Sequence, residues 1–340
     1  MIMKTPYIEH SGKVIETNST YPLVMAIALD PRTKYRFGVL RCITHREGDV
    51  MIKGYTDRSE LHKVTGDTLE HFEIGEKISI KGEEEVIKSL MKPGLEFIGL
   101  EDPDIWVDEK TDLMHLYFTI PLICNDETLP HTANVHLGHA VGKDLDSLVM
   151  TEPALIADTE GRYAKEVSIA PLNSNGFRYN LVESCTREKG IKYSTVRVAI
   201  AHDMGKPWEF GETVYNPIEH NIPWIAHHAS PGPLFPESFI DVGKGKRLGV
   251  LNGREKSIVE GKITHYKMFS VGLFIYDIEV GKIDWVSPEP LIQDSEAKTI
   301  TFASQFVETN NGEGILYAHV DDSFVRAYTL KAEDIKSLLP

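Results

Sequence analysis

The sequence predicts an all-β protein, specifically a five-bladed β-propeller. The first observation is a fivefold repeat, in which a short apolar strand is followed by a turn, a second strand and a third strand. The second strands are the clearest and occupy residues 35–42, 113–119, 177–184, 247–253 and 314–320. Successive repeats are roughly 60 to 80 residues apart, which suits propeller blades that carry long loops. The second observation is that helical periodicity is weak outside residues 83–92 and 332–339.

The blades are expected at about residues 18–80, 95–158, 162–218, 225–293 and 298–331, within one domain that spans residues 1–340. Third strands rich in β-branched or aromatic residues are expected at 50–56, 135–141, 195–201, 271–278 and 324–330, and a polar turn follows four of them, the first at 57–59. The fifth repeat lacks an outer strand, so an N-terminal segment such as residues 14–17 is expected to close the ring. A β-sandwich would not explain a fivefold repeat, and no linker marks two separate β domains.

The composition narrows the classes of partner. Acidic residues outnumber basic ones by 51 to 36, which gives a net charge of −15. No run of Lys or Arg could overcome that charge at a phosphate backbone, so a nucleic-acid partner is not expected. No stretch approaches the roughly 20 apolar residues that span a bilayer, so no membrane partner and a cytoplasmic location are expected. The three cysteines are far apart, and neither a metal nor a cofactor is predicted.

Carboxylates at the start of two expected inner strands are the candidate catalytic residues. In a propeller the first strand of each blade lines the central channel. Glu101 and Asp102 precede Pro103 in the second blade, and Lys165 and Glu166 open the third. Burial of an ionised carboxylate costs free energy unless the group is paired with a cation or takes part in function. Two carboxyl groups facing each other across a sugar-sized gap are what cleavage of a glycosidic bond requires.

The fourth blade supplies further candidate ligands for a sugar. His228 and Ser230 lie in its expected first strand, and Trp224 precedes it. An imidazole can donate or accept a hydrogen bond near neutral pH, and an aromatic face suits the apolar face of a pyranose. These residue types indicate a carbohydrate partner.

Several motifs, in order along most of the chain, resemble the five-bladed propeller glycosidases, namely glycoside hydrolase family 130 and the related family 43. Gly99 to Val107 resembles the Glu-Asp-Pro motif of the second blade in family 130, and Arg41 resembles the sugar-binding arginine that ends a strand of the first blade. Residues 165–167 resemble the Lys-Asp-Ala stretch of that family, and residues 229–233 its Gly/Pro-rich start of the fourth blade. The resemblance implies a glycosidase, plausible substrates being small β-linked oligosaccharides such as mannosides.

The two families imply different roles for the same two side chains. On the family 130 pattern, Asp102 is the proton donor. On the family 43 pattern, Asp102 tunes a neighbouring pKa and Glu166 donates the proton. An inverting reaction with these two acids would place their carboxyl groups about 6.5 to 9.5 Å apart, with water between them. The general base is unassigned, with Glu183, Glu237 and Glu255 as candidates.

Departures from family 130 favour hydrolysis over phosphorolysis. The phosphorylases carry basic phosphate-holding motifs where this chain has Asp104, residues 182–184 and residues 252–254. Such a site depends on charge-assisted hydrogen bonds. A phosphorylase that uses inorganic phosphate remains an alternative, because Lys165, His228 and Arg254 could form another anion site. A propeller that binds carbohydrate without catalysis is a third hypothesis.

Overall fold

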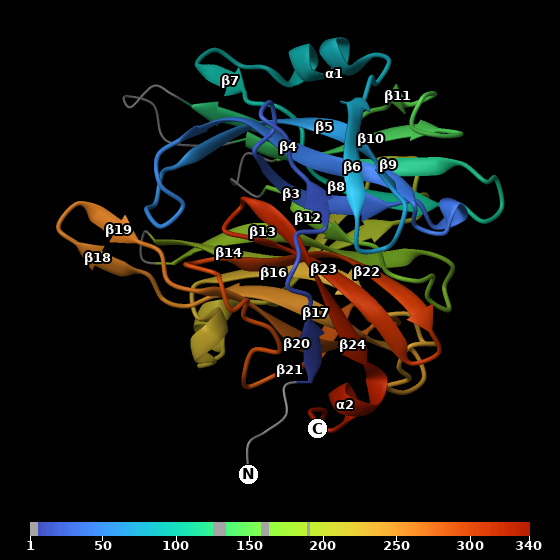
Figure 1. Cartoon of the computed structure of the whole chain (residues 1–340), viewed down its shortest axis with the longest axis vertical. Helices are drawn as coiled ribbons and strands as arrows, with labels where there is room; N and C mark the ends of the chain where they lie inside the picture. The colour runs from blue at the N-terminus through green and yellow to red at the C-terminus, as the bar shows by residue number, and fades with distance from the viewer. Residues whose placement is uncertain (1–5, 125–133, 158–162, 189–190) are drawn as a thin grey trace.

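The computed structural model describes residues 6–124, 134–157, 163–188 and 191–340, and the regular secondary structure of this part of the chain is mostly β-strand (Figure 1). The helices α1 (Glu83–Leu90) and α2 (Ala332–Lys336) lie at the periphery, and three short 3₁₀ turns, η1 (Pro31–Thr33), η2 (Pro217–Glu219) and η3 (Pro223–Ile225), connect strands. Within the described ranges, no helix is both long enough and apolar enough to cross a membrane.

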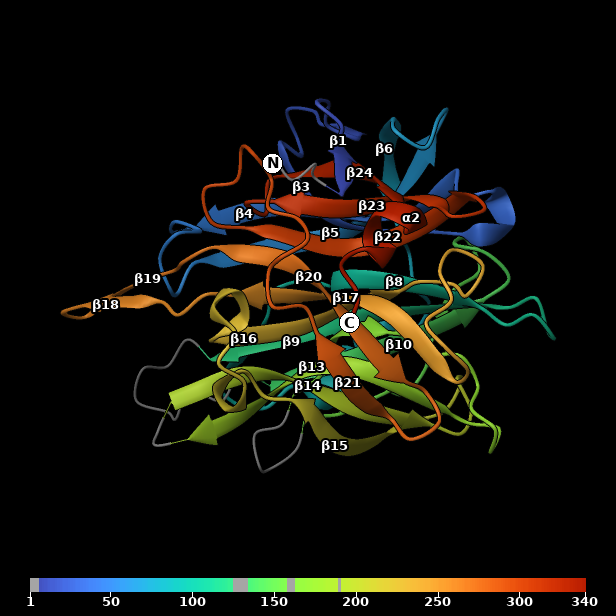
Figure 2. The ribbon, with the colours of Figure 1, turned by 90° about the horizontal axis from the view of Figure 1, so that it is seen from below.

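The strands pair in successive antiparallel groups along the chain (Figure 2). The first contains β3 (Leu23–Leu29), β4 (Phe37–Glu47), β5 (Thr56–Gly66) and β6 (Phe72–Lys77), and the second β8 (Glu101–Val107), β9 (Met114–Cys124), β10 (Asn134–Gly142) and β11 (Val149–Met150), with β7 (Leu95–Phe97) also on β9. A third contains β12 (Lys165–Ser168), β13 (Arg178–Glu188), β14 (Ile191–Ala201) and β15 (Glu209–Tyr215).

The remaining groups complete the fold. One contains β16 (His228–Leu234), β17 (Lys246–Arg254), β20 (Phe269–Asp277) and β21 (Lys282–Val286), and the hairpin of β18 (Ile258–Glu260) and β19 (Ile263–His265) projects from it. The last contains β22 (Thr301–Asn310), β23 (Glu313–Val320), β24 (Phe324–Lys331) and β1 (Tyr7–Glu9). A single parallel bridge between Ser194 and His228 joins the third group to the fourth.

The first strand of each group faces a common centre. The strands β3, β8, β12, β16 and β22 contact one another in cyclic order. Buried apolar clusters lie between neighbouring groups, one of them formed by side chains of the first and last groups such as Leu40, Val64, Tyr317 and Ala327. Because each sheet buries both faces against its neighbours, the inner strand ends are held at fixed positions. The architecture is therefore propeller-like.

Two strand predictions are wrong in detail. The third strand of the first group is β5, which begins at Thr56, so the expected turn at residues 57–59 lies inside a strand instead of after one. This strand buries polar residues, including Asp57 and Ser59, and that polarity misleads a reading based on hydrophobic pattern.

The N-terminal strand that pairs with β24 is β1, and the expected segment 14–17 lies elsewhere. Tyr7 pairs with Leu330 and Glu9 with Tyr328, whereas Ile15 and Glu16 form β2, which pairs in parallel with β6. Val14 and Ile15 are buried in the apolar cluster beside Phe72, which explains why this apolar segment leaves the outer edge of β24 to β1.

Candidate active site

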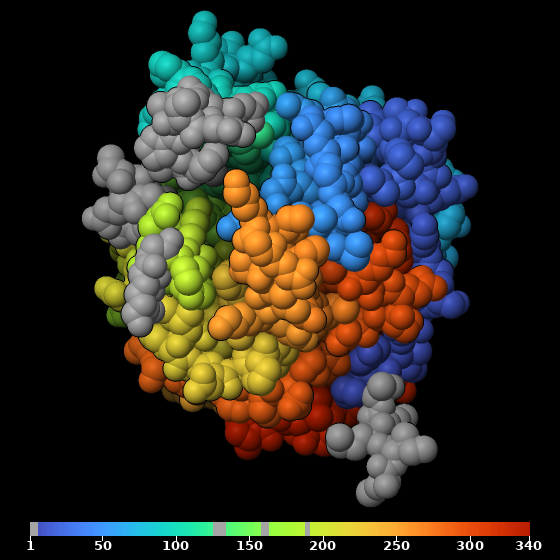
Figure 3. All heavy atoms as spheres, turned by 90° about the vertical axis from the view of Figure 1, so that its left-hand side faces the viewer, coloured from blue at the N-terminus to red at the C-terminus, as the bar shows by residue number. Residues whose placement is uncertain are grey.

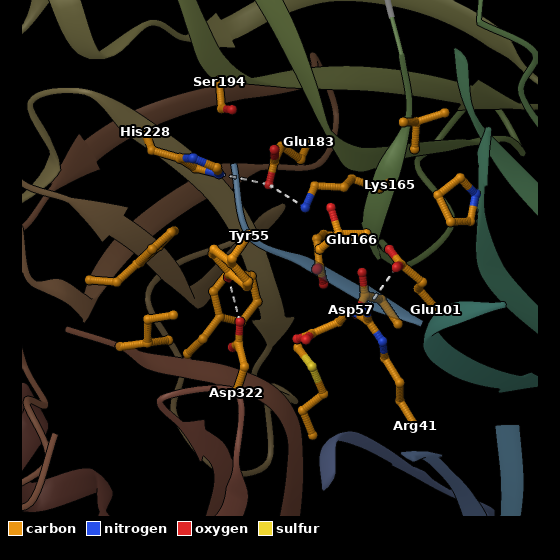
Figure 4. A pocket seen from close by; sticks show the side chains of 18 of the residues that line it. Arg41, Tyr55, Asp57, Glu101, Lys165, Glu166, Glu183, Ser194, His228 and Asp322 are labelled. Atoms are coloured by element: carbon orange, nitrogen blue, oxygen red, sulfur yellow. Dashed lines mark hydrogen bonds and ion pairs between the residues drawn. The ribbon is translucent and has the colours of Figure 1, made fainter. Parts of the chain in front are cut away.

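A cavity of about 390 Å³ opens at one end of the inner strands and receives side chains from the first strands of several groups. Figure 4 shows Arg41, Glu101, Lys165, Glu166, Glu183 and His228 directed into it. Figure 3 views the molecule from the side on which the β18–β19 hairpin (orange) projects. The hairpin lies against the segment around residues 51–53 (blue). Backbone hydrogen bonds from Lys53 to Thr264 and from Tyr266 to Met51 fix that contact.

Irregular pairing of the inner strands brings consecutive side chains to the cavity. In a regular strand, neighbouring residues point to opposite faces. Here the register shifts between Glu101 and Asp104 in β8 and between Lys165 and Ser168 in β12, as in a β-bulge. Asp102 and Glu166 adopt φ angles of 48° and 51°, which are uncommon for residues with a side chain. Two neighbouring charged residues of each strand therefore line the cavity, Glu101 with Asp102 and Lys165 with Glu166.

Arg41 fixes the two carboxylates of β8. Its Nη2 donates to Glu101 Oε1 at 2.6 Å, its Nη1 to Asp102 Oδ1 at 2.8 Å, and its Nε to Ser59 Oγ at 3.1 Å. Burial raises the pKa of Glu101 to about 7 despite the arginine. Burial also opposes ionisation of Asp102, but Arg41 and Lys165 outweigh it and hold the pKa of Asp102 below its usual value. Of the two carboxyl groups of β8, Asp102 is therefore the one that ionises more readily.

The carboxyl groups of Asp102 and Glu166 are in hydrogen-bond contact. Burial, and then the charge of Asp102, raises the pKa of Glu166 well above its usual value. Of the two carboxyl groups, Glu166 is therefore the one that holds the shared proton more strongly. The expected gap of about 6.5 to 9.5 Å between these two acids is absent. The bulges place both side chains at one point of the cavity, so they cannot act as an acid and a base on either side of a water molecule.

Glu183 supplies a third carboxylate from β13. It is fully buried and lies 2.9 Å from His228 Nε2 and 3.8 Å from Lys165 Nζ. Its other oxygen accepts a hydrogen bond of 2.9 Å from the hydroxyl of Tyr163. Burial opposes ionisation, but His228 and Lys165 lower the pKa of Glu183 far below its usual range. Glu183 is therefore ionised across the physiological pH range.

Seven of the nine predicted site residues line the cavity, namely Asp102, Glu166, Arg41, Glu101, Lys165, His228 and Arg254. Ser230 does not, because its side chain is completely buried within the sheet. Trp224 is also wrong as a sugar platform. It is 4% exposed, donates its indole N–H to the Ser287 carbonyl, and packs on Gly253 and Gly272.

The three candidates for the general base differ in their position relative to the cavity. Of the three, only Glu183 lines the cavity. Glu237 forms an ion pair of 2.8 Å with Arg247, which lines a different cavity. Glu255 lies just beyond β17 and does not reach the cavity wall.

Several cavity residues were not predicted from the sequence. Tyr55 donates a hydrogen bond of 2.6 Å to Asp322, which also lies 3.1 Å from His319 Nε2. Tyr163 lies two residues before Lys165, a spacing that places residues on one face of a strand and could have identified it. No strand spacing of this kind could have identified Tyr55 or Asp322, because Tyr55 belongs to a loop and Asp322 to a hairpin turn. Among the described residues, no group of three or more His, Cys, Asp or Glu could hold a metal ion.

Comparisons with known proteins bear on the fold. No protein-family model and no curated protein matches the chain. Among solved structures, a provisionally named glycosidase from Bacteroides thetaiotaomicron is 18% identical, with a TM-score of 0.67 over 96% of this chain and 97% of its own. A β-1,2-mannobiose phosphorylase from Listeria innocua is 15% identical, with a TM-score of 0.57 over 98% and 90%. A glycosyl hydrolase from Bacteroides ovatus is 16% identical, with a TM-score of 0.62 over 93% and 85%. The likeness confirms the predicted resemblance at the level of the fold.

Proposed function

We propose that the chain is a glycoside hydrolase that cleaves a small β-linked oligosaccharide, such as a mannoside, with inversion at the anomeric carbon. We further propose that residues 1–340 form one five-bladed propeller whose blades are the five strand groups, with β1 closing the ring. The cyclic contacts of the inner strands and the solved structures of similar fold support this. The observation that carries the function is a proton-sharing carboxyl pair beside an ionised carboxylate in one cavity.

The Asp102–Glu166 pair is the proposed acid. Glu166 holds the proton because ionisation of a second buried carboxyl group beside Asp102 is unfavourable. As the glycosidic bond breaks, that proton passes to the leaving-group oxygen and the negative charge left on the pair is stabilised by Arg41 and Lys165. This arrangement favours the family 43 pattern, in which the aspartate tunes the pKa and the glutamate donates.

Glu183 is the proposed general base. It stays ionised and it enters the cavity from β13, across Lys165 from the acid pair (Figure 4). A water molecule that attacks the anomeric carbon would give its proton to Glu183. Tyr163 and His228 hold the carboxylate in position.

The same contacts favour hydrolysis over the alternative of phosphorolysis. Two of the three basic side chains considered for a phosphate site, Lys165 and His228, already face Glu183. A phosphate bound between them would be repelled by that carboxylate. Inorganic phosphate as second substrate and carbohydrate binding without turnover are the two alternatives that the experiment must separate.

The cytoplasmic location stays a prediction from the sequence.

The test is a screen of aryl β-glycosides and β-linked manno-oligosaccharides, with and without inorganic phosphate. We expect sugar release without phosphate, a product of inverted anomeric configuration by ¹H NMR, and loss of turnover in Glu183→Gln. Glu237→Gln is the matched control, because it makes the same change on a carboxylate outside the cavity. Release that requires phosphate would identify a phosphorylase. Binding of oligosaccharide with no turnover under either condition would leave only the non-catalytic function.

A further inference from the structure

Arg254 is a buried cation at the wall of the proposed active site. It ends β17, pairs in register with His228 of β16, lines the cavity, and is 9% exposed. The Cζ atom of its guanidinium group lies over two aromatic rings, 3.9 Å from the centroid of Tyr266 and 4.7 Å from that of Phe269. Stacking of this kind holds the group in one plane.

Arg254 has no counterion among the residues that the structure describes. In the part of the chain that the structure describes, no carboxylate lies within ion-pair distance of Arg254, and its Nε has no hydrogen-bond partner. The other buried or half-buried arginines of the site region contrast with it, since Arg41 pairs with Glu101 and Asp102, and Arg46 with Asp57. Burial of an unpaired charge is unfavourable by several kcal/mol, so such a group is normally kept for a ligand.

The surroundings of Arg254 favour an anion. His227 precedes the paired strand and His228 begins it. Burial first, and then nearby basic groups that include Arg254 and Lys53, lower the pKa of His227 to about 4, which indicates positive potential at this place. A guanidinium group that stacks on aromatic rings keeps its N–H edge available for hydrogen bonds. A planar N–H edge binds a carboxylate or phosphate oxygen pair in bidentate fashion.

We propose that Arg254 forms an oxyanion subsite of the cavity, which recognises a carboxylate or phosphate group in the substrate complex. The group has two possible sources, the carboxylate of a sugar-acid unit of the oligosaccharide or free inorganic phosphate. The subsite itself rests on the geometry of Arg254, and only the claim that the oxyanion takes part in turnover rests on the proposed function.

The first experiment measures binding and does not depend on catalysis. Thermal shift and calorimetry would compare mannuronate, glucuronate and inorganic phosphate with neutral mannose. The variants are Arg254→Met, which keeps the length of the side chain, Arg254→Lys, and the control Lys256→Met, which removes one exposed positive charge two residues away. We expect at least one oxyanion to bind the wild type and Lys256→Met, and to bind Arg254→Met about 10- to 100-fold more weakly, as for a lost charge-assisted hydrogen bond.

The second experiment identifies the source of the oxyanion. Preference of kcat/KM for a uronic-acid glycoside over its neutral counterpart, lost in Arg254→Met and retained in Lys256→Met, would assign the subsite to the substrate. Turnover of neutral substrate that rises with phosphate, and loses this dependence in Arg254→Met, would assign it to phosphate. The inference is overturned if folded Arg254→Met, checked by circular dichroism, binds every oxyanion as the wild type does, or if no oxyanion binds the wild type. Absence of any turnover with oxyanion binding intact would refute the proposed function and leave the subsite standing.

Discussion

Replacement of Arg41 by Met tests whether this arginine is what keeps two buried carboxylates ionisable in the site. Arg41 is 6% exposed, and its guanidinium group contacts Glu101 at 2.6 Å and Asp102 at 2.8 Å. Removal of one partner from a buried ion pair costs about 3–5 kcal/mol, because a charge is left without compensation. With an unfolding entropy of about 2 cal/mol/K per residue, a chain of this length should lose roughly 4–7 °C in melting temperature.

The loss should depend on pH. In the wild type the pKa of Asp102 lies below its usual value, so this group contributes stability above its unfolded pKa and loses it as the pH falls through the folded value. Without Arg41, burial raises the pKa of Asp102 above the unfolded value, so its contribution becomes unfavourable as the pH rises. The difference in melting temperature between the variant and the wild type should therefore be larger at pH 8 than at pH 5.

Differential scanning calorimetry at both pH values provides the measurement. Arg254→Met is the matched control, because it removes a buried arginine that has no carboxylate partner. We expect it to shift the melting temperature by less than Arg41→Met does, and we expect Glu101→Gln to recover part of the loss when combined with Arg41→Met. Equal losses in the two arginine variants, or a difference that stays constant between pH 5 and pH 8, would refute this account of the ion pairs.

Three further predictions concern the carboxyl groups. Glu183→Gln should reduce kcat about 10²- to 10⁴-fold while substrate affinity, measured by calorimetry, changes little, and unchanged turnover would exclude Glu183 as the base. Glu166→Gln should slow aryl glycosides with poor leaving groups more than those with good ones, measured as kcat against leaving-group pKa, whereas an equal loss for all of them would argue against proton donation. Burial raises the pKa of Asp104 to about 7, so this group destabilises the fold increasingly as the pH rises from about 4 through 7. Asp104→Asn should accordingly raise the melting temperature at pH 8 but not at pH 4, and an equal shift at both, or a shift matched by Asp108→Asn in the neighbouring turn, would contradict this.

The strand framework was accessible from the sequence because it depends on local pattern. Alternating and continuous apolar runs placed the second strands and most third strands correctly, as in β10 and β24. The pattern failed in β5, where buried Asp57 and Ser59 serve the site and the strand appears polar. It also failed for β1, because the pairing partner of β24 is selected by tertiary packing and not by the apolar character of the segment.

The residues of the site were easier to predict than their geometry. Asp102 and Glu166 could be identified as buried charges in inner strands. Their contact arises from bulges and positive φ angles, which cannot be predicted from the residue types. Trp224 was misassigned because its exposure depends on Gly253 and Gly272, where a Cβ atom would come within 2.5 and 2.3 Å of the indole. Two distant glycines create the space that buries this ring, and only the folded chain brings them together.

The pairing of β1 with β24 has a consequence for how the chain reaches its native state. Arg326 and Glu9 make contact although they are 317 positions apart in the sequence. A ribosome must therefore release almost the entire polypeptide before the first strand can find its neighbour, and until then the edge of β24 is open to other chains. Deletion of residues 6–10 should leave the other strands formed but convert this edge into a nucleation point for aggregation.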